Sequence, residues 1–413
     1  MAALPFLPLY ALLEVFIFLA LAELVGAFGE RLGLPSIVAY LLLGMLLSGF
    51  AFGGVIDRAA GIDLFDASSP HASYITLFGD LSVVLLLFAA GLSGGFRGLR
   101  AAGLPAVLGA IAGDLIPFAI TVLVGVAFFP LPEALLLGVA IAPTSSAVVA
   151  SLRRSEHVEE TPGGQFLIHL AALDDVVALL LLSTVLTILG GQQDVVAITG
   201  SVLGSIVAWL VLLVAAVLVI PRLLRIPSLR AAPSMPFLFL FVLVALVTGL
   251  GLAAVVGAFI AGLAVAESLV AERTRELTEV LLLFFGALFF VVVGAQFDAR
   301  FFADLPLVAA ALGLALLASV GKLLGVYPFC VQKLGDRSQA RATALGMIPR
   351  GEIGLVVASL GLAAGLVDRE FLVLVVLVSL TTTVAGSLVF RRVSGALRPA
   401  APSPSAAEAA GTP

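Results

Sequence analysis

Apolar residues occur along the chain in long blocks, and short polar or glycine- and proline-containing segments separate these blocks. About 20 predominantly apolar residues are enough for an α-helix to cross the hydrocarbon core of a bilayer. The block lengths therefore predict thirteen membrane-spanning helices. Their approximate positions are residues 8–28, 34–52, 74–95, 104–129, 133–152, 163–190, 196–222, 235–250, 253–270, 278–297, 304–330, 339–365 and 370–391.

The composition agrees with a chain that lies mostly within a membrane. Hydrophobic residues make up 62% of it and charged residues only 11%, whereas soluble domains carry about 25% charged residues. This excludes an ordinary water-soluble core, and the net charge of −5 gives no basis for nucleic-acid binding. The single cysteine, Cys330, permits no intrachain disulfide. We therefore expect an all-α polytopic membrane protein.

The distribution of Lys and Arg predicts how the helices are oriented. Sixteen of the 21 basic residues fall after the odd-numbered spans 1 to 11 or in the C-terminal tail, and three fall on the other side. Because cytoplasmic loops are enriched in Lys and Arg, the N-terminus should lie outside and the C-terminus in the cytoplasm. No basic residue precedes the first apolar segment, which favours a retained span over a signal peptide. Residues 392–413, rich in Ala, Pro and Ser, predict a disordered cytoplasmic tail.

Two predicted spans contain a proline followed by small or polar residues, in IAPTSSAVVA around Pro143 and GMIPRGEIGL around Pro349. They lie seven spans apart, so they run in opposite directions, as inverted repeats require. Proline and glycine remove backbone hydrogen bonds and expose carbonyl groups that can bind a cation. The pattern predicts two broken helices that cross, and the alternative is a pair of simple proline kinks.

Two adjacent carboxylates, Asp174 and Asp175, interrupt an otherwise apolar span. A charge at that depth costs a few kcal/mol or more, and intramembrane acids usually face partners or a water-filled pathway. Neighbouring residues on a helix point about 100° apart, so the two acids can serve different partners while they repel each other. This arrangement predicts a proton-linked cation site.

Other polar residues inside spans are candidates for the same site. Lys322 needs a carboxylate if it is buried, and Asp174 and Asp175 are both possible partners; snorkelling to the interface is the alternative. The hydroxyls of Thr144 and Ser145 are hard oxygen ligands of the kind that small alkali cations prefer, so Asp175, Asp174 and Thr144 are the predicted cation ligands.

Three further ionisable residues are assigned supporting roles. Arg350 and Glu352 lie two residues apart in the second broken segment, where they can neutralise each other or bond to exposed backbone groups. Asp114 lies inside the span at 104–129, where it can line the ion pathway or cap a break at Pro117.

The motifs APTSSAVV, LDDVVALLLL, VGKLLG and PRGEIGLVVASLG, in this order and spacing, resemble the bacterial sodium/proton antiporters of the monovalent cation:proton antiporter superfamily, second branch. The resemblance covers residues 8–391. It implies thirteen spans, a core domain formed by residues 104–190 and 298–391, and a dimer domain formed mainly by residues 1–103 and 191–297. The first helix of residues 191–297 would be a linker between the two domains. It also implies elevator-like alternating access.

The resemblance also implies individual roles. Asp175 would bind the ion and the proton, while Asp174 would pair with Lys322 and release it when sodium enters. Relatives that move no net charge tend to have Asn in place of Asp174, so the double Asp implies an electrogenic exchanger. One departure is Ser93, where many relatives have Glu; this puts in doubt a pH-sensing or interface role at that position.

The sequence hypothesis is therefore an electrogenic Na+/H+ antiporter, with Li+ as a second candidate substrate and pH homeostasis as its physiological role. It would be a homodimer in the bacterial cytoplasmic membrane, among lipids, with no cofactor, no nucleic-acid partner and no enzyme activity. K+/H+ exchange on the same fold is the alternative. An intramembrane aspartyl protease is a remote alternative, because its two acids must converge from separate helices, and a cation channel would need acidic rings or carbonyl filters repeated by symmetry.

Overall fold

The computed structural model describes residues 7–31, 35–60, 72–95, 103–189, 195–250 and 253–398, and this part of the chain is helical without β-strands. The helices are α1 (Leu7–Arg31), α2 (Ser36–Leu47), α3 (Phe52–Ala60), α4 (Ala72–Gly94), α6 (Leu104–Gly125), α7 (Leu131–Ile141), α8 (Ser146–Ser155), α9 (Pro162–Leu189), α10 (Val195–Leu223), α11 (Pro227–Ala231), α12 (Met235–Gly249), α13 (Ala254–Ala266), α14 (Ala271–Ala295), η2 (Ala299–Ala303), α15 (Leu305–Leu334), α16 (Arg337–Leu345), α17 (Glu352–Ala363), α18 (Arg369–Val393) and η3 (Ser394–Leu397).

The predicted all-α polytopic membrane fold is confirmed. Within the described residues, ten helical segments are long and apolar enough to cross a membrane, and three shorter apolar helices are α12, α13 and α17. Each of the thirteen predicted segments coincides with one helix or with a pair of consecutive helices. The count of thirteen spans stays a prediction, because α12 and α13 have only 15 and 13 residues.

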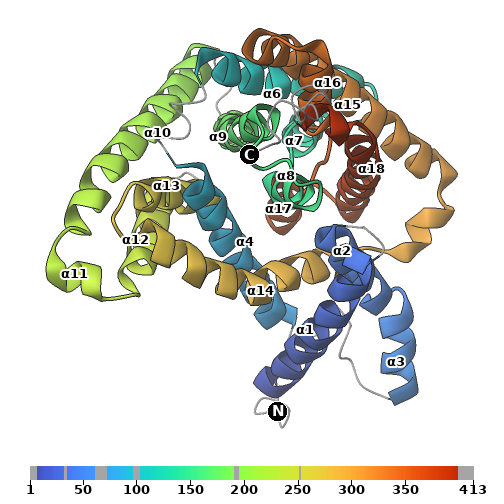
Figure 1. Ribbon diagram of the computed structural model, residues 1–413. Coiled ribbons are helices and arrows are strands. Elements are labelled where there is room, and N and C mark those ends of the chain that lie inside the picture. The colour runs from blue at the N-terminus through green and yellow to red at the C-terminus, as the bar shows by residue number, and fades with distance from the viewer. Residues whose placement is uncertain are drawn as a thin grey trace, which may run out of the picture.

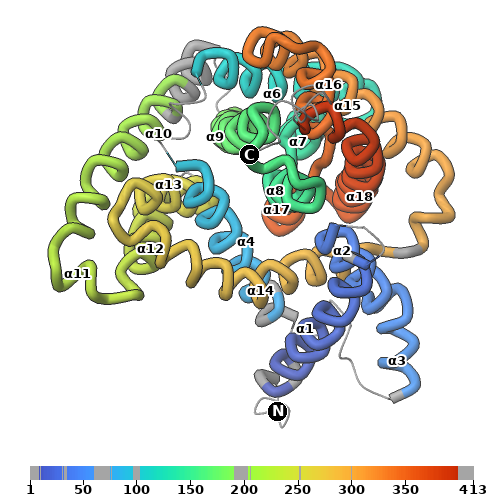
Figure 2. The backbone as a smooth tube through the Cα atoms, viewed as in Figure 1, coloured from blue at the N-terminus to red at the C-terminus, as the bar shows by residue number. Residues whose placement is uncertain are grey.

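The helices pack in two groups, which Figure 1 shows as separate bundles. One group contains α6, α7, α8, α9, α15, α16, α17 and α18; the other contains α1, α2, α4, α12, α13 and α14. The long helix α10 runs along one side and contacts both α9 and α13 (Figure 2). The predicted division into a core domain and a dimer domain, and any relative motion of the two, stays a prediction.

Glycines let several helices approach almost to backbone contact. A Cβ atom added to Gly262 of α13 would lie 2.1 Å from the Phe88 carbonyl oxygen of α4, and one added to Gly91 of α4 would lie 2.2 Å from the Phe259 carbonyl oxygen. Close approach through small residues is the usual way in which helices associate inside a membrane, where lipid is as apolar as leucine.

We expect Gly262→Ala to destabilise the protein by about 1–3 kcal/mol, because the added methyl group overpacks the α4–α13 contact. The measurement is the melting temperature of the purified protein in detergent. Gly313→Ala is the matched control, since no atom lies within 4 Å of a Cβ there and alanine forms helix better than glycine by about 1 kcal/mol. Equal melting temperatures for the two variants would contradict this account of the packing.

The C-terminal end is more ordered than its composition predicts. Residues Ser394–Leu397 form the 3-10 helix η3, and Leu397 is buried. The Ser394 hydroxyl donates to Glu156 Oε2 at 2.7 Å, and Arg398 Nη2 donates to the Glu156 carbonyl oxygen at 3.0 Å. The prediction that the disordered tail begins at residue 392 is therefore wrong for residues 392–397, because tertiary contacts fix them. Residues 399–413 lie outside the described residues.

Candidate ion-binding site

Two interrupted helices lie at the centre of the first group. Helix α7 ends at Ile141 and α8 begins at Ser146, while α16 ends at Leu345 and α17 begins at Glu352. The cause is local, because proline lacks the N–H that would continue the helix and disfavours helical geometry in the preceding residue. Pro143 and Pro349 each lie within one of the two interruptions.

The two interruptions cross and are bonded to each other. The Ser145 backbone N–H donates to the Pro349 carbonyl oxygen at 2.8 Å, and the Thr144 hydroxyl donates to the Met347 carbonyl oxygen at 2.9 Å. Because lipid offers no hydrogen bonds, backbone groups freed inside a membrane must find partners within the protein. The predicted pair of crossing broken helices is confirmed, and the alternative of two simple kinks is wrong.

Charged side chains lie at the helix ends created by the breaks. Arg350 Nη1 donates to the Ala142 carbonyl oxygen at 2.7 Å, just past the C-terminus of α7, and Nη2 donates to the Ala318 carbonyl oxygen at 3.0 Å. The positive charge of Arg350 complements the partial negative charge at the C-terminus of α7.

Glu352 accepts hydrogen bonds at the N-terminus of α8, from the Ser145 hydroxyl, from the Ser146 hydroxyl at 3.1 Å and from the Ala147 N–H at 3.1 Å. The sequence allowed Arg350 and Glu352 either to neutralise each other or to bond to groups exposed by the breaks. Within the described residues they do the second, and no ion pair joins the two side chains.

Lys322 is fully buried and all three of its protons have acceptors. Its Nζ lies 2.5 Å from Asp174 Oδ1, 2.8 Å from Asp114 Oδ1 and 3.1 Å from the Ala142 carbonyl oxygen. The Thr144 N–H in turn donates to Asp174 Oδ2 at 2.7 Å. Of the two aspartates that the sequence left open, Asp174 is therefore the one that contacts the lysine.

Asp114 is a second carboxylate on the same lysine, which the sequence did not indicate. Helix α6 continues through Pro117 without a break, so the predicted alternative that Asp114 caps a break at Pro117 is wrong. Its carboxylate instead forms an ion pair with Lys322 of α15.

Asp175 differs from its neighbour because no described group donates a hydrogen bond to either of its carboxylate oxygens. Its side chain is only 1% exposed. The Ser146 hydroxyl lies beside it but donates to Glu352. A buried ionised carboxylate without donors is unfavourable, and a bound proton or cation stabilises it. The charged groups that act on it are three other buried carboxylates, namely Glu352, Asp174 and Asp114.

The predicted hydroxyl ligands lie at the crossing, where each donates to another group. Thr144 and Ser145 are buried and donate to Met347 and Glu352, and their oxygens still have lone pairs that can accept or bind a cation. Ser146 also lies at the crossing and was not predicted from the sequence, where its only signal is its place in the run Thr144-Ser145-Ser146. Within the described residues, no group of three His, Cys, Asp or Glu side chains converges as a metal site. The assignment of Na+ ligands stays a prediction.

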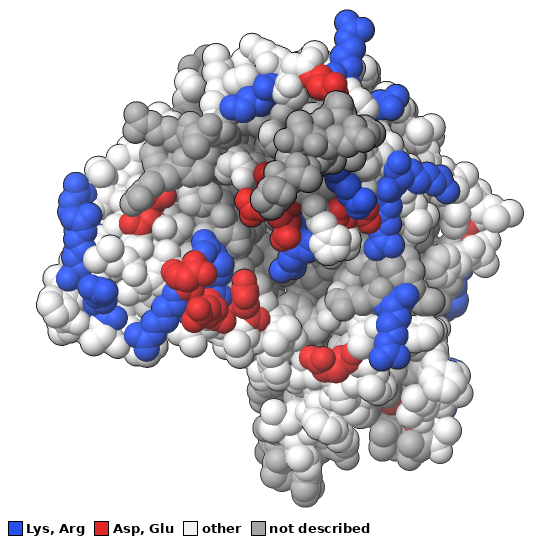
Figure 3. All heavy atoms as spheres, viewed as in Figure 1, with Lys and Arg blue, Asp and Glu red and all other residues white. Residues whose placement is uncertain are grey.

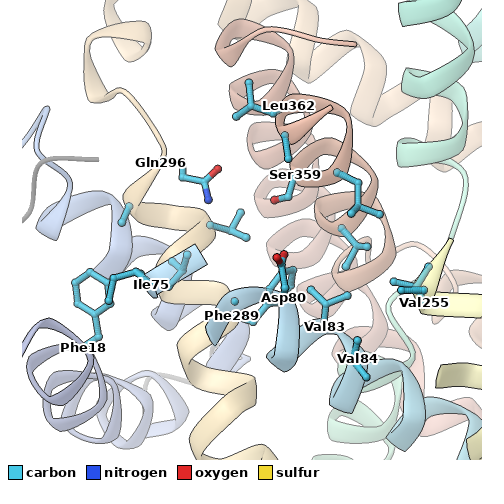
Figure 4. Close-up of a pocket in the computed structure, with 18 of the residues that line it drawn as sticks. Phe18, Ile75, Asp80, Val83, Val84, Val255, Phe289, Gln296, Ser359 and Leu362 are labelled. Carbon is cyan, nitrogen blue, oxygen red and sulfur yellow. The ribbon is translucent and has the colours of Figure 1, made fainter. Parts of the chain in front are cut away.

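A cavity of about 530 Å³ lies between the two helix groups. Side chains from α1, α4, α13, α14 and α17 line it, and they are mostly apolar (Figure 4). Asp80, Gln296 and Ser359 provide polar groups, and Figure 4 shows the Asp80 carboxylate directed toward Ser359. Val356 also lines the cavity, one helical turn along α17 from Glu352. The cavity thus ends close to the buried charges.

The family described as "Sodium/hydrogen exchanger, transmembrane" matches residues 16–394. The chain belongs to this family. The resemblance of its motifs to monovalent cation:proton antiporters is thereby confirmed at the level of the superfamily, and the second branch stays a prediction. A family of transporters gives no support to the aspartyl protease alternative.

The alignments with known relatives extend over nearly the whole chain of this exchanger. It is 27% identical over 369 residues to the "Na(+)/H(+) antiporter" of Enterococcus hirae, covering 88% of this chain and 92% of the relative. It is 24% identical over 377 residues to the "Na(+)/H(+)-K(+) antiporter GerN" of Bacillus cereus, covering 90% and 92%. The solved structure of the sodium proton antiporter MjNhaP1 of Methanocaldococcus jannaschii matches with a TM-score of 0.72 at 18% identity, over 95% of this chain and 98% of that one. This likeness shows the fold.

Proposed function

We propose that this exchanger moves Na+, and Li+ as a second substrate, in exchange for H+, with Asp175 as the shared binding carboxylate. The observation that carries the proposal is the environment of Asp175, which is buried at the crossing of two broken helices without a described hydrogen-bond donor. Such a carboxylate is stabilised by one proton or by one cation. Because both cannot occupy it at once, loading one substrate expels the other, and this competition couples the two fluxes.

The second aspartate makes the exchange electrogenic. Asp174 is held by Lys322 and by the Thr144 N–H, and in the proposed cycle it turns to the incoming cation and is protonated when the cation leaves. Two carboxyl groups can then carry two protons against one monovalent cation. Such a cycle moves net charge, and each elementary charge moved across the membrane is worth about 2.3 kcal/mol per 100 mV.

We infer elevator-like access, in which residues 104–190 and 298–391 carry the site as a core domain. The cavity between the two helix groups supports this, because its walls come from both groups and it reaches within one turn of Glu352. Gln296 and Arg369, which line it, adjoin the predicted loops that carry few basic residues. In the proposed cycle this cavity is the route from the outside.

The proposed location is the bacterial cytoplasmic membrane, as a homodimer, with the N-terminus outside. Support comes from the basic residues, which gather in the loops expected in the cytoplasm. Figure 3 shows Lys and Arg side chains spread over the viewed face, with Asp and Glu among them.

A tag fused after Pro413 should react with an impermeant reagent only after the cells are opened. The reason is the split of sixteen basic residues against three between the two predicted sides. Labelling efficiency in intact and permeabilised cells is the measurement, and a cysteine placed on the Arg300 loop is the opposite control. Labelling of the tag in intact cells would mean that the number of spans is wrong.

K+/H+ exchange is the second candidate, because one relative is named as a Na(+)/H(+)-K(+) antiporter. The deciding experiment uses the purified protein in liposomes that contain a pH dye. After the liposome interior has been acidified, Na+, Li+ or K+ is added in turn outside, so that cation entry drives proton exit. We expect dye recovery with Na+ and Li+ and little with K+. Recovery with K+ alone would replace the proposed substrate, and no recovery with any of the three would reject monovalent cation exchange.

A further inference from the structure

Lys322 has two carboxylate partners, and only one of them is needed to neutralise it. Building on the function proposed above, we propose that Asp114 is the standing partner of Lys322, which holds the ammonium group while Asp174 turns to the transported cation. Asp114 is a positioning residue in this role, because it acts on the cation only through Lys322 and Asp174.

The backbone around Asp114 and Lys322 is tightly fixed. A Cβ atom added to Gly325 would lie 2.4 Å from the Ala112 carbonyl oxygen, and one added to Gly321 would lie 3.0 Å from Pro117 Cα. These glycines flank Lys322 by one and three residues, so α15 and α6 are in backbone contact on both sides of the ion pair. The 2.8 Å contact between Lys322 and Asp114 therefore joins two helices that cannot shift independently.

Asp174 has a different kind of support. It lies on α9, and its second oxygen accepts from the Thr144 N–H, inside the interruption of α7 and α8. A cation that enters the crossing competes with that N–H and with Lys322 for the same carboxylate. Asp114 Oδ1 accepts from Lys322, and Asp114 Oδ2 accepts from no described donor.

The contact with Asp114 keeps the charge of Lys322 balanced when the contact with Asp174 is broken. A buried ammonium group that loses its only carboxylate is strongly destabilising, and that penalty would oppose every release of Asp174. With Asp114 in place, Lys322 stays paired after Asp174 has left. The lysine then keeps a carboxylate partner throughout the cycle, and the exchanged protons are carried by Asp175 and Asp174. The other charged groups at this point are Arg350 and Glu352, which stay bonded at the helix ends.

The first test is the apparent KM for Na+ in proteoliposomes. In Asp114→Asn the lysine binds Asp174 as its sole charged partner, so Na+ has to compete harder, and we expect KM to rise about tenfold or more with an unchanged maximal rate. Asp114→Glu should restore most of the affinity because it keeps the charge. Asp304→Asn is the matched control, since Asp304 caps the outer end of α15 and Asn caps equally well. An unchanged KM in Asp114→Asn would overturn the proposal.

The second test needs no transport. Asp114→Asn or Asp174→Asn alone leaves Lys322 with one carboxylate, whereas the double variant leaves it with none. We expect the loss of melting temperature in the double variant to exceed the sum of the two single losses. Additive losses would overturn the proposal, and so would a greater-than-additive loss combined with an unchanged KM, because Asp114 would then be only structural. If the wild type exchanges no monovalent cation, the proposed function fails, while the melting data still decide which residues hold the lysine.

Discussion

Replacing Asp175 with Asn should abolish cation-driven proton movement. The amide has nearly the shape of the carboxyl group but does not titrate and carries no charge, so it can neither release a proton to Na+ nor bind Na+ as a carboxylate. The rate of dye recovery in proteoliposomes should fall to that of liposomes without protein. Because the proposed mechanism passes every substrate through this one group, we expect no partial activity at higher Na+ concentration.

The same variant should remain folded. Asp175 accepts no hydrogen bond from the described residues, so the substitution removes a buried charge without breaking a described contact, and the melting temperature should be unchanged or higher. Gel filtration and melting in detergent verify this, and Asp304→Asn provides an Asp-to-Asn change outside the site. Near-normal Na+-dependent recovery in Asp175→Asn would remove Asp175 from the binding site.

The helical fold could be predicted from the sequence because the bilayer imposes a simple requirement on length and polarity. Proline positions also located the interruptions of α7–α8 and α16–α17, since the loss of an N–H is a local effect. The ordered end at Ser394–Leu397 could not be predicted. Its order depends on Glu156, which is far away in the sequence, and composition carries no information about such contacts.

The charged residues of the candidate site could be predicted from the sequence, but not all of their contacts. Asp174 and Lys322 stand out because a charge inside an apolar span is costly and needs a partner. The contact of Asp114 with Lys322 depends on how closely α6 and α15 approach through Gly321 and Gly325, which is a tertiary property.

The separate bonds of Arg350 and Glu352 were also beyond the sequence. The two side chains are close in the chain, but Arg350 is bonded at the C-terminus of α7 and Glu352 at the N-terminus of α8, on the two sides of the other interruption. Proximity in sequence therefore suggested a mutual ion pair as readily as the arrangement that the structure has.

Lys322→Ala should cause the largest loss of stability of any single substitution in the site. It leaves Asp114 and Asp174 fully buried without the ammonium group that neutralises them. Removing one partner of a buried ion pair typically costs about 3–5 kcal/mol, whereas replacing all partners by neutral groups can be nearly neutral. The melting temperature in detergent should therefore fall markedly in Lys322→Ala. It should fall less in the control Lys333→Ala, because Lys333 is exposed in the last turn of the same helix.

Stability should return in steps as the stranded charges are removed. Lys322→Ala with Asp174→Asn should recover part of the loss, and the further change Asp114→Asn should recover most of the remainder. A triple variant as unstable as Lys322→Ala alone would show that the lysine stabilises the protein by packing, and that its charge does not hold the two aspartates.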